Sequence, residues 1–154
     1  MGSNATSALK IGAAVFLTIA LITIVVNLFM SATDAVKEGQ TQFSKIQTQL
    51  SQTRYNIYED TTLTGSQVMN AVRQFNNENQ FGVFVQTGKN GMTYYGNTFN
   101  QTSGEIEGTA KNTNILPAQD EANNNYINPS GKFKSSVVRD ANNMVRGIIF
   151  VQTK

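Results

Sequence analysis

An uncharged apolar stretch near the N-terminus constrains this chain more than any other feature. It extends over 20 residues from Ile11 to Met30 and follows Lys10 directly. A helix of that length rises about 30 Å, which matches the hydrocarbon thickness of a bilayer. The apolar core of a cleaved secretory signal is shorter and ends in a small-x-small site, whereas this stretch ends in Leu28-Phe29-Met30. We therefore expect a retained helix that spans a membrane.

The charges on either side of this segment predict its orientation. The N-terminal flank carries Lys10 and the α-amine, whereas Asp34, Lys37 and Glu38 on the other side nearly cancel. Because positive flanks stay in the cytoplasm, we expect a cell-membrane protein whose C-terminal domain lies outside.

Small and weakly polar residues share one face of the apolar segment at 100° per residue, and large residues share the opposite face. The small-polar face holds Ala13, Ala20, Asn27 and Ser31 with Thr23 beside them, and the opposite face holds Ile11, Val15, Ile22, Val26 and Phe29. Small residues let helices approach closely in lipid, and an amide can hydrogen-bond across the interface. Either this alignment arises by chance, or the helix packs against other helices.

The helical pattern continues beyond the membrane. Large apolar residues recur every seven positions, with one more between them: Val36, Phe43, Ile46, Leu50 and Ile57. We define these five as the outer stripe, and they predict one helix over about 6–58, roughly 80 Å long. The stripe needs a partner, which is either a neighbouring copy or the chain's own sheet; packing under the sheet is the favoured prediction. Residues 1–32 and 33–60 thus form two parts of one helix.

Residues 61–154 predict an α+β domain. Thr64 and Gln67 match a capping box and place a second short helix over about 65–78. Two hairpins are expected, one over 81–99 that turns at Asn90-Gly91 and one over 131–154 that turns at 140–143. Together they predict a four-stranded antiparallel sheet, with the polar stretch 100–131 as a surface insert.

Composition excludes several classes of function. The chain has no Cys and no His, which removes thiol nucleophiles, ordinary zinc sites and His-based triads. Only 14% of residues are charged, with a net charge of +2, and no basic patch indicates nucleic acid. We expect no enzyme and no cofactor. The abundance of Asn, Gln, Ser and Thr fits either an extracytoplasmic protein that packs against copies of itself or simply a loop-rich hydrophilic domain.

The order of these segments resembles type IV pilins and the pseudopilins of related secretion systems. A short tail, an apolar helix, its amphipathic extension and an antiparallel sheet follow one another in that family too. The resemblance implies a helix that lies in lipid before assembly and in a filament core afterwards. The chain departs from the family's pattern because Lys10-Ile11-Gly12 is followed by Leu17, not glutamate, at the fifth position after the glycine.

Two functions fit these observations. The first is a structural subunit that self-assembles through its N-terminal helix into an extracellular pilus-like filament, with other copies, membrane lipid and an assembly machinery as its partners. The alternative is a single-pass membrane protein whose outer domain is an accessory or binding component of a secretion, conjugation or transport complex.

Overall fold

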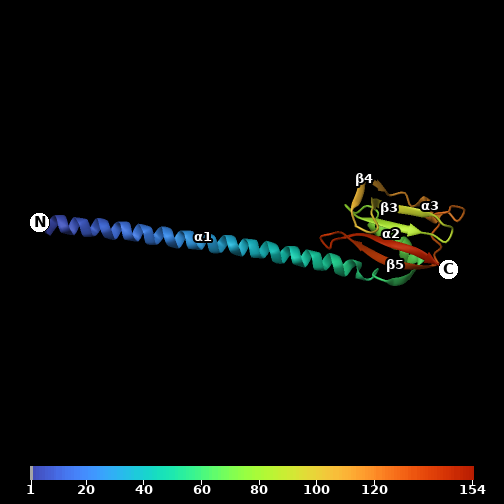
Figure 1. The fold of residues 1–154 in the computed structure, drawn as a ribbon, viewed down its shortest axis with the longest axis horizontal. Helices are drawn as coiled ribbons and strands as arrows, with labels where there is room; N and C mark the ends of the chain where they lie inside the picture. The colour runs from blue at the N-terminus through green and yellow to red at the C-terminus, as the bar shows by residue number, and fades with distance from the viewer. Residues whose placement is uncertain (1) are drawn as a thin grey trace. The chain divides into compact units, whose positions relative to one another are not determined.

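The structure is a computed structural model that describes residues 2–154. The chain forms two compact units, of which one ends at Gln47 and the other comprises Thr48–Lys154. Its elements, labelled in Figure 1, are α1 (Gly2–Asn56), β1 (Thr61–Thr64), α2 (Gly65–Phe75), β2 (Gly82–Gln86), β3 (Met92–Phe99), β4 (Ile106–Asn112), α3 (Leu116–Gln119), β5 (Lys132–Arg139) and β6 (Val145–Thr153). We call the second unit the C-terminal domain.

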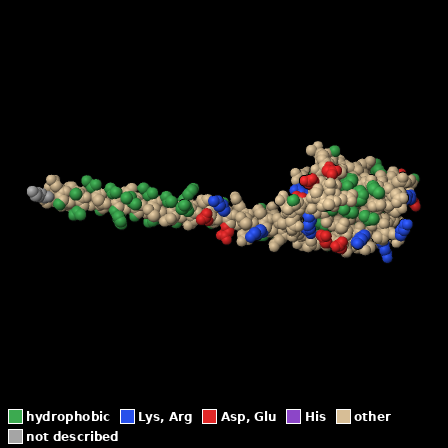
Figure 2. Space-filling model, viewed as in Figure 1, with side chains coloured by type: hydrophobic (Ala, Val, Ile, Leu, Met, Phe, Trp, Pro, Cys, Tyr) green, Lys and Arg blue, Asp and Glu red, His purple; other side chains and the backbone are tan. Residues whose placement is uncertain are grey.

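Helix α1 confirms the prediction of one continuous N-terminal helix. It extends over 55 residues, and Gly39 lies inside it without ending it. Figure 2 shows hydrophobic side chains along its N-terminal half, where the helix is long and apolar enough, by length and composition, to cross a membrane. The layout of a long apolar N-terminal helix followed by a sheet domain is compatible with a pilin-like fold.

The predicted capping box of α2 is confirmed. Thr64 Oγ1 accepts a hydrogen bond from the backbone N–H of Gln67, and Gln67 Oε1 accepts one from the backbone N–H of Thr64. Two of the free N–H groups at the start of the helix are thereby satisfied. The helix ends at Phe75, earlier than the sequence pattern indicates.

The predicted four-stranded antiparallel sheet is wrong. The sheet has six strands in the order β1-β5-β6-β2-β3-β4, and it is mixed because β2 and β6 run parallel. Both expected hairpins do form, β2 with β3 and β5 with β6. The prediction lacks two features. One is the parallel pairing of β2 with β6, which joins the two hairpins. The other is the pair of edge strands, β1 and β4, whose exposed residues show no alternation of apolar and polar positions.

The main core lies between α2 and one face of the sheet. Helix α2 contributes Val68, Val72 and Phe75, and the sheet contributes alternate residues of its central strands: Val83, Val85, Tyr95, Phe133, Ile148 and Phe150. Each such side chain stabilises the fold by about 1.5–3 kcal/mol through burial. Ser135 is also fully buried there, and its hydroxyl donates to the carbonyl of Tyr58 at 2.8 Å.

The opposite face of the sheet carries a second, smaller cluster of Phe84, Phe99 and Val138. The ring of Phe99 lies over two paired glycines, Gly82 and Gly147. A Cβ at Gly147 would stand 2.3 Å from that ring, and one at Gly82 would stand 2.8 Å from it. The absence of side chains at both positions therefore creates the space in which Phe99 is buried.

The stretch 100–131, expected as a plain surface insert, contains both β4 and α3. Backbone hydrogen bonds tie its end to the start of α2, from Gly65 N to Gly131 O at 2.9 Å and from Ser66 N to Pro129 O at 3.1 Å. It is thus an integral part of the C-terminal domain.

Candidate functional site

The five residues of the predicted small-polar face all lie on α1, and their side chains are exposed apart from a half-buried Ala20. The hydroxyl of Thr23 donates to the carbonyl of Ile19 at 2.8 Å, and that of Thr18 donates to the carbonyl of Ala14 at 2.8 Å. Hydroxyls that bond back to the helix in this way need no further partner in lipid.

Asn27 differs from these threonines. No group within residues 2–154 makes a hydrogen bond to its side-chain amide, although Asn27 lies within the apolar segment of α1, three residues before the end of that segment at Met30. An amide left without a partner in an apolar environment costs several kcal/mol. Within the described apolar segment, Asn27 is therefore the polar residue that most needs a group from outside the chain.

The outer stripe is exposed in the single chain. Its exposed fractions lie between 51% for Ile46 and 66% for Leu50, and Val36, Phe43 and Ile57 fall between them. Packing of these side chains under the sheet stays a prediction, as does packing against a neighbouring copy. Large apolar side chains in a row outside the membrane segment are typical of an interaction surface.

The last turn of α1 and the turn that follows it do join the core of the C-terminal domain, through Tyr55 and Tyr58 respectively. The ring of Tyr55 stacks on Phe81 with centroids 4.9 Å apart, and its hydroxyl donates to Glu78 Oε2 at 2.8 Å. Burial raises the pKa of the Tyr55 phenol, and the hydrogen bond to Glu78 raises that pKa further. Arg54 completes this corner with an ion pair of 2.7 Å to Glu78.

In the oxygen-rich loop after α3, side-chain oxygens accept hydrogen bonds from backbone N–H groups of the same loop. Asp120 Oδ1 accepts from the N–H of Ala122, and Asn123 Oδ1 accepts from the N–H of Asn125. These are turn-forming contacts of the kind that Asp and Asn make in loops. In the described part of the chain, no group of three or more Asp, Glu, His or Cys side chains is arranged to hold a metal ion.

No family model, no curated protein and no solved structure matches this chain.

Proposed function

We propose that this chain is a structural subunit that inserts α1 into a membrane and then self-assembles through that helix into a pilus-like filament outside the cell. The observation that carries the proposal is the amide of Asn27, which has no partner within residues 2–154 and lies in the apolar, uncharged segment Ile11–Met30 of α1. Copies of the same helix offer each other a matching amide at the same depth.

Close approach of the helices supports the proposal. Ala13 and Ala20 lie on the same face as Asn27, and Ser31 continues it. Small residues on one face reduce the distance between helix axes, which brings interhelical amides within hydrogen-bond range. The exposed outer stripe gives a second contact surface along the same helix.

Introduced cysteines test self-association directly, because the chain has none of its own. We expect Ser31→Cys, on the small-polar face, to form disulfide-linked dimers in intact membranes. Phe29→Cys on the opposite face is the matched control and should crosslink much less. Equal crosslinking of both variants, or none from either, would contradict a specific helix interface.

Asn27→Leu tests the role of the amide. We expect the variant to enter the membrane normally and to lose filaments that can be sheared from cells. Thr23→Val is the control, because its hydroxyl is already satisfied within the helix and its shape is retained. Full-length wild-type protein found only as a monomer in membranes would overturn the filament. A stoichiometric crosslink to a different protein would instead favour the accessory component of a secretion, conjugation or transport complex.

A further inference from the structure

Two adjoining hollows in the C-terminal domain share Gln80 and Ile106 as lining residues. Their volumes are about 650 Å³ and about 430 Å³. We call them together the amide groove; the residues that define it here are Asn79, Gln80, Asn97, Ile106, Lys111 and Arg146. Hollows of this size accommodate small organic ligands.

A bulge in β4 opens the larger hollow. Asn97 of β3 pairs with Lys111, whereas the next residue, Thr98, pairs with Glu107, so residues 108–110 loop out of the ladder. Gly108 lies in this loop with φ 83° and open space where a Cβ would stand. Bulges of this kind often re-aim side chains beside binding sites, and here the bulge lies next to Asn97.

Asn97 is the unusual residue of the groove. It is 4% exposed, and its side-chain oxygen Oδ1 has no hydrogen-bond partner among residues 2–154. A buried acceptor without a donor lowers the stability of the fold, and a hydrogen bond to that acceptor would recover the lost free energy. A ligand in the groove that carries an O–H or N–H group can supply the donor.

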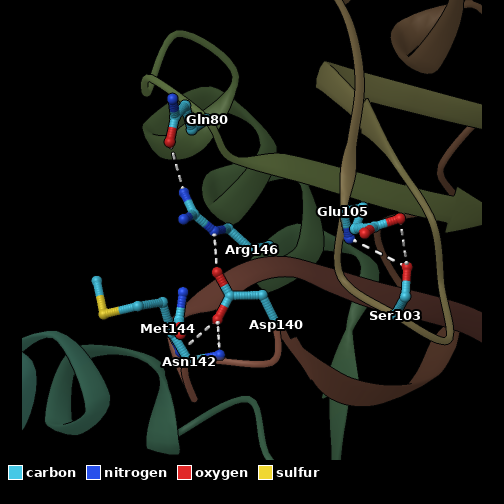
Figure 3. A network of polar contacts seen from close by, with 7 residues as sticks. All are labelled: Gln80, Ser103, Glu105, Asp140, Asn142, Met144 and Arg146. Carbon is cyan, nitrogen blue, oxygen red and sulfur yellow. Dashed lines mark hydrogen bonds and ion pairs between the residues drawn. The ribbon is translucent and has the colours of Figure 1, made fainter.

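In the smaller hollow, hydrogen bonds hold the side chains of Asp140, Arg146 and Gln80 in fixed orientations (Figure 3). Asp140 Oδ1 accepts from the N–H groups of Asn142 and Met144, and Asp140 Oδ2 accepts from Arg146 Nε at 2.8 Å. Arg146 in turn donates to Gln80 Oε1 at 2.7 Å. Since its oxygen is occupied, Gln80 keeps its amide N–H groups for a ligand.

The second amide of the groove is oriented in the same way. Lys111 Nζ donates to Asn79 Oδ1 at 2.6 Å and to the carbonyl of Asn77 at 3.1 Å. The amide nitrogen of Asn79 is left as a donor. The groove therefore combines spare amide donors with a buried acceptor that has no donor, Asn97 Oδ1, and with the carboxylate of Glu105, and Ile106 is its main apolar contact.

We propose that the amide groove binds an oligosaccharide. Sugar hydroxyls both donate and accept hydrogen bonds, so neighbouring hydroxyls of one chain satisfy Asn97 Oδ1 and the amides of Gln80 and Asn79 together. A peptide is a poorer match because Ile106 is the one large apolar side chain among the residues that line the two hollows. The proposal does not depend on filament assembly.

The test uses the full chain in phosphatidylcholine nanodiscs, which avoids sugar-based detergents. Chitotriose, cellotriose, maltotriose and trigalacturonate are titrated in turn, with trialanine as the peptide probe, while amide signals are followed by NMR. We expect saturable binding of at least one trisaccharide, with shifts at Asn97 and Gln80. Asn97→Leu keeps the shape of the side chain and should weaken binding about tenfold, the cost of one hydrogen bond of about 1.4 kcal/mol.

Two further variants keep the result decisive. Gln80→Gly removes the amide at a position whose φ is 53°, a conformation that glycine adopts without strain, and should also weaken binding. Asn70→Leu makes the same chemical change in a different hollow, beside α2, and should leave binding unchanged. The proposal is overturned if no trisaccharide saturates, if Asn97→Leu and Gln80→Gly bind as wild type does, or if trialanine binds instead.

Discussion

The phenolic hydroxyl of Tyr55 donates a 2.8 Å hydrogen bond to Glu78 Oε2 and so connects the last turn of α1 to the loop after α2. The hydroxyl of Tyr95, by contrast, is buried and has no hydrogen-bond partner among residues 2–154. Both rings are almost fully buried, with exposed fractions of 4% and 1%. The two tyrosines therefore allow the same substitution, tyrosine to phenylalanine, to be compared at a hydroxyl with a hydrogen-bond partner and at one without.

Tyr55→Phe should lower the free energy of unfolding by about 1–2 kcal/mol, because it removes a hydrogen bond to a charged acceptor. Tyr95→Phe should leave stability unchanged or raise it by about 1 kcal/mol, because it removes a buried hydroxyl without a partner. Urea unfolding of the full chain in nanodiscs, followed by near-ultraviolet circular dichroism, measures both. Equal losses in the two variants would contradict the assigned hydroxyl environments.

Stability should fall at alkaline pH. Burial raises the pKa of Tyr95 to about 12 and also raises the pKa of Tyr55 and Tyr58. A tyrosine in the unfolded chain ionises near pH 10. Above that pH the unfolded chain releases protons that the folded chain retains, so the stabilisation present below pH 10 is lost as pH rises through the folded pKa.

Urea unfolding at pH 8 and pH 11 measures this loss. Tyr95→Phe should reduce the difference between the two pH values, because phenylalanine cannot ionise in either state. If the variant loses as much stability as the wild type between these pH values, then Tyr95 does not contribute to the alkaline effect.

Gly147→Ala should destabilise the C-terminal domain by about 1–3 kcal/mol through overpacking. The new methyl group would stand 2.3 Å from the Phe99 ring, so that ring or the backbone must move. Gly39→Ala is the control, because no atom lies within 4 Å of its Cβ position, and alanine favours a helix by about 1 kcal/mol over glycine. Thermal unfolding of both variants measures these changes in stability. Adding Phe99→Leu to Gly147→Ala should recover part of the stability that Gly147→Ala loses.

Features with a strong local signal could be predicted from the sequence. The uninterrupted helical pattern of α1, the Thr64–Gln67 capping box and the two hairpins all depend on residues close in the chain. The turn at Asn90-Gly91 is one example, since Asn90 adopts φ 62° and asparagine tolerates that conformation well.

Features that depend on distant pairing could not be predicted. Nothing in the residues of β2 indicates that it lies parallel to β6, because both strands are apolar runs that fit either direction. Strand β1 has only four residues, and β4 is interrupted by its bulge. Asn97 lies beside that bulge and is 4% exposed, yet its sequence neighbours do not distinguish it from the many exposed asparagines.

The small-polar face of α1 can be tested by steric bulk alone. Ala20→Leu adds a large side chain to the face that holds Asn27 and should keep neighbouring helices apart, whereas Ala14→Leu adds the same bulk on another side of the helix. Both changes retain an apolar helix, so both variants should enter the membrane equally. We expect crosslinking through Ser31→Cys to fall at least tenfold in the Ala20→Leu background and to persist in the Ala14→Leu background. Loss of crosslinking in both backgrounds would mean that the helix packs through more than one face, and persistence in both would exclude close contact at Ala20.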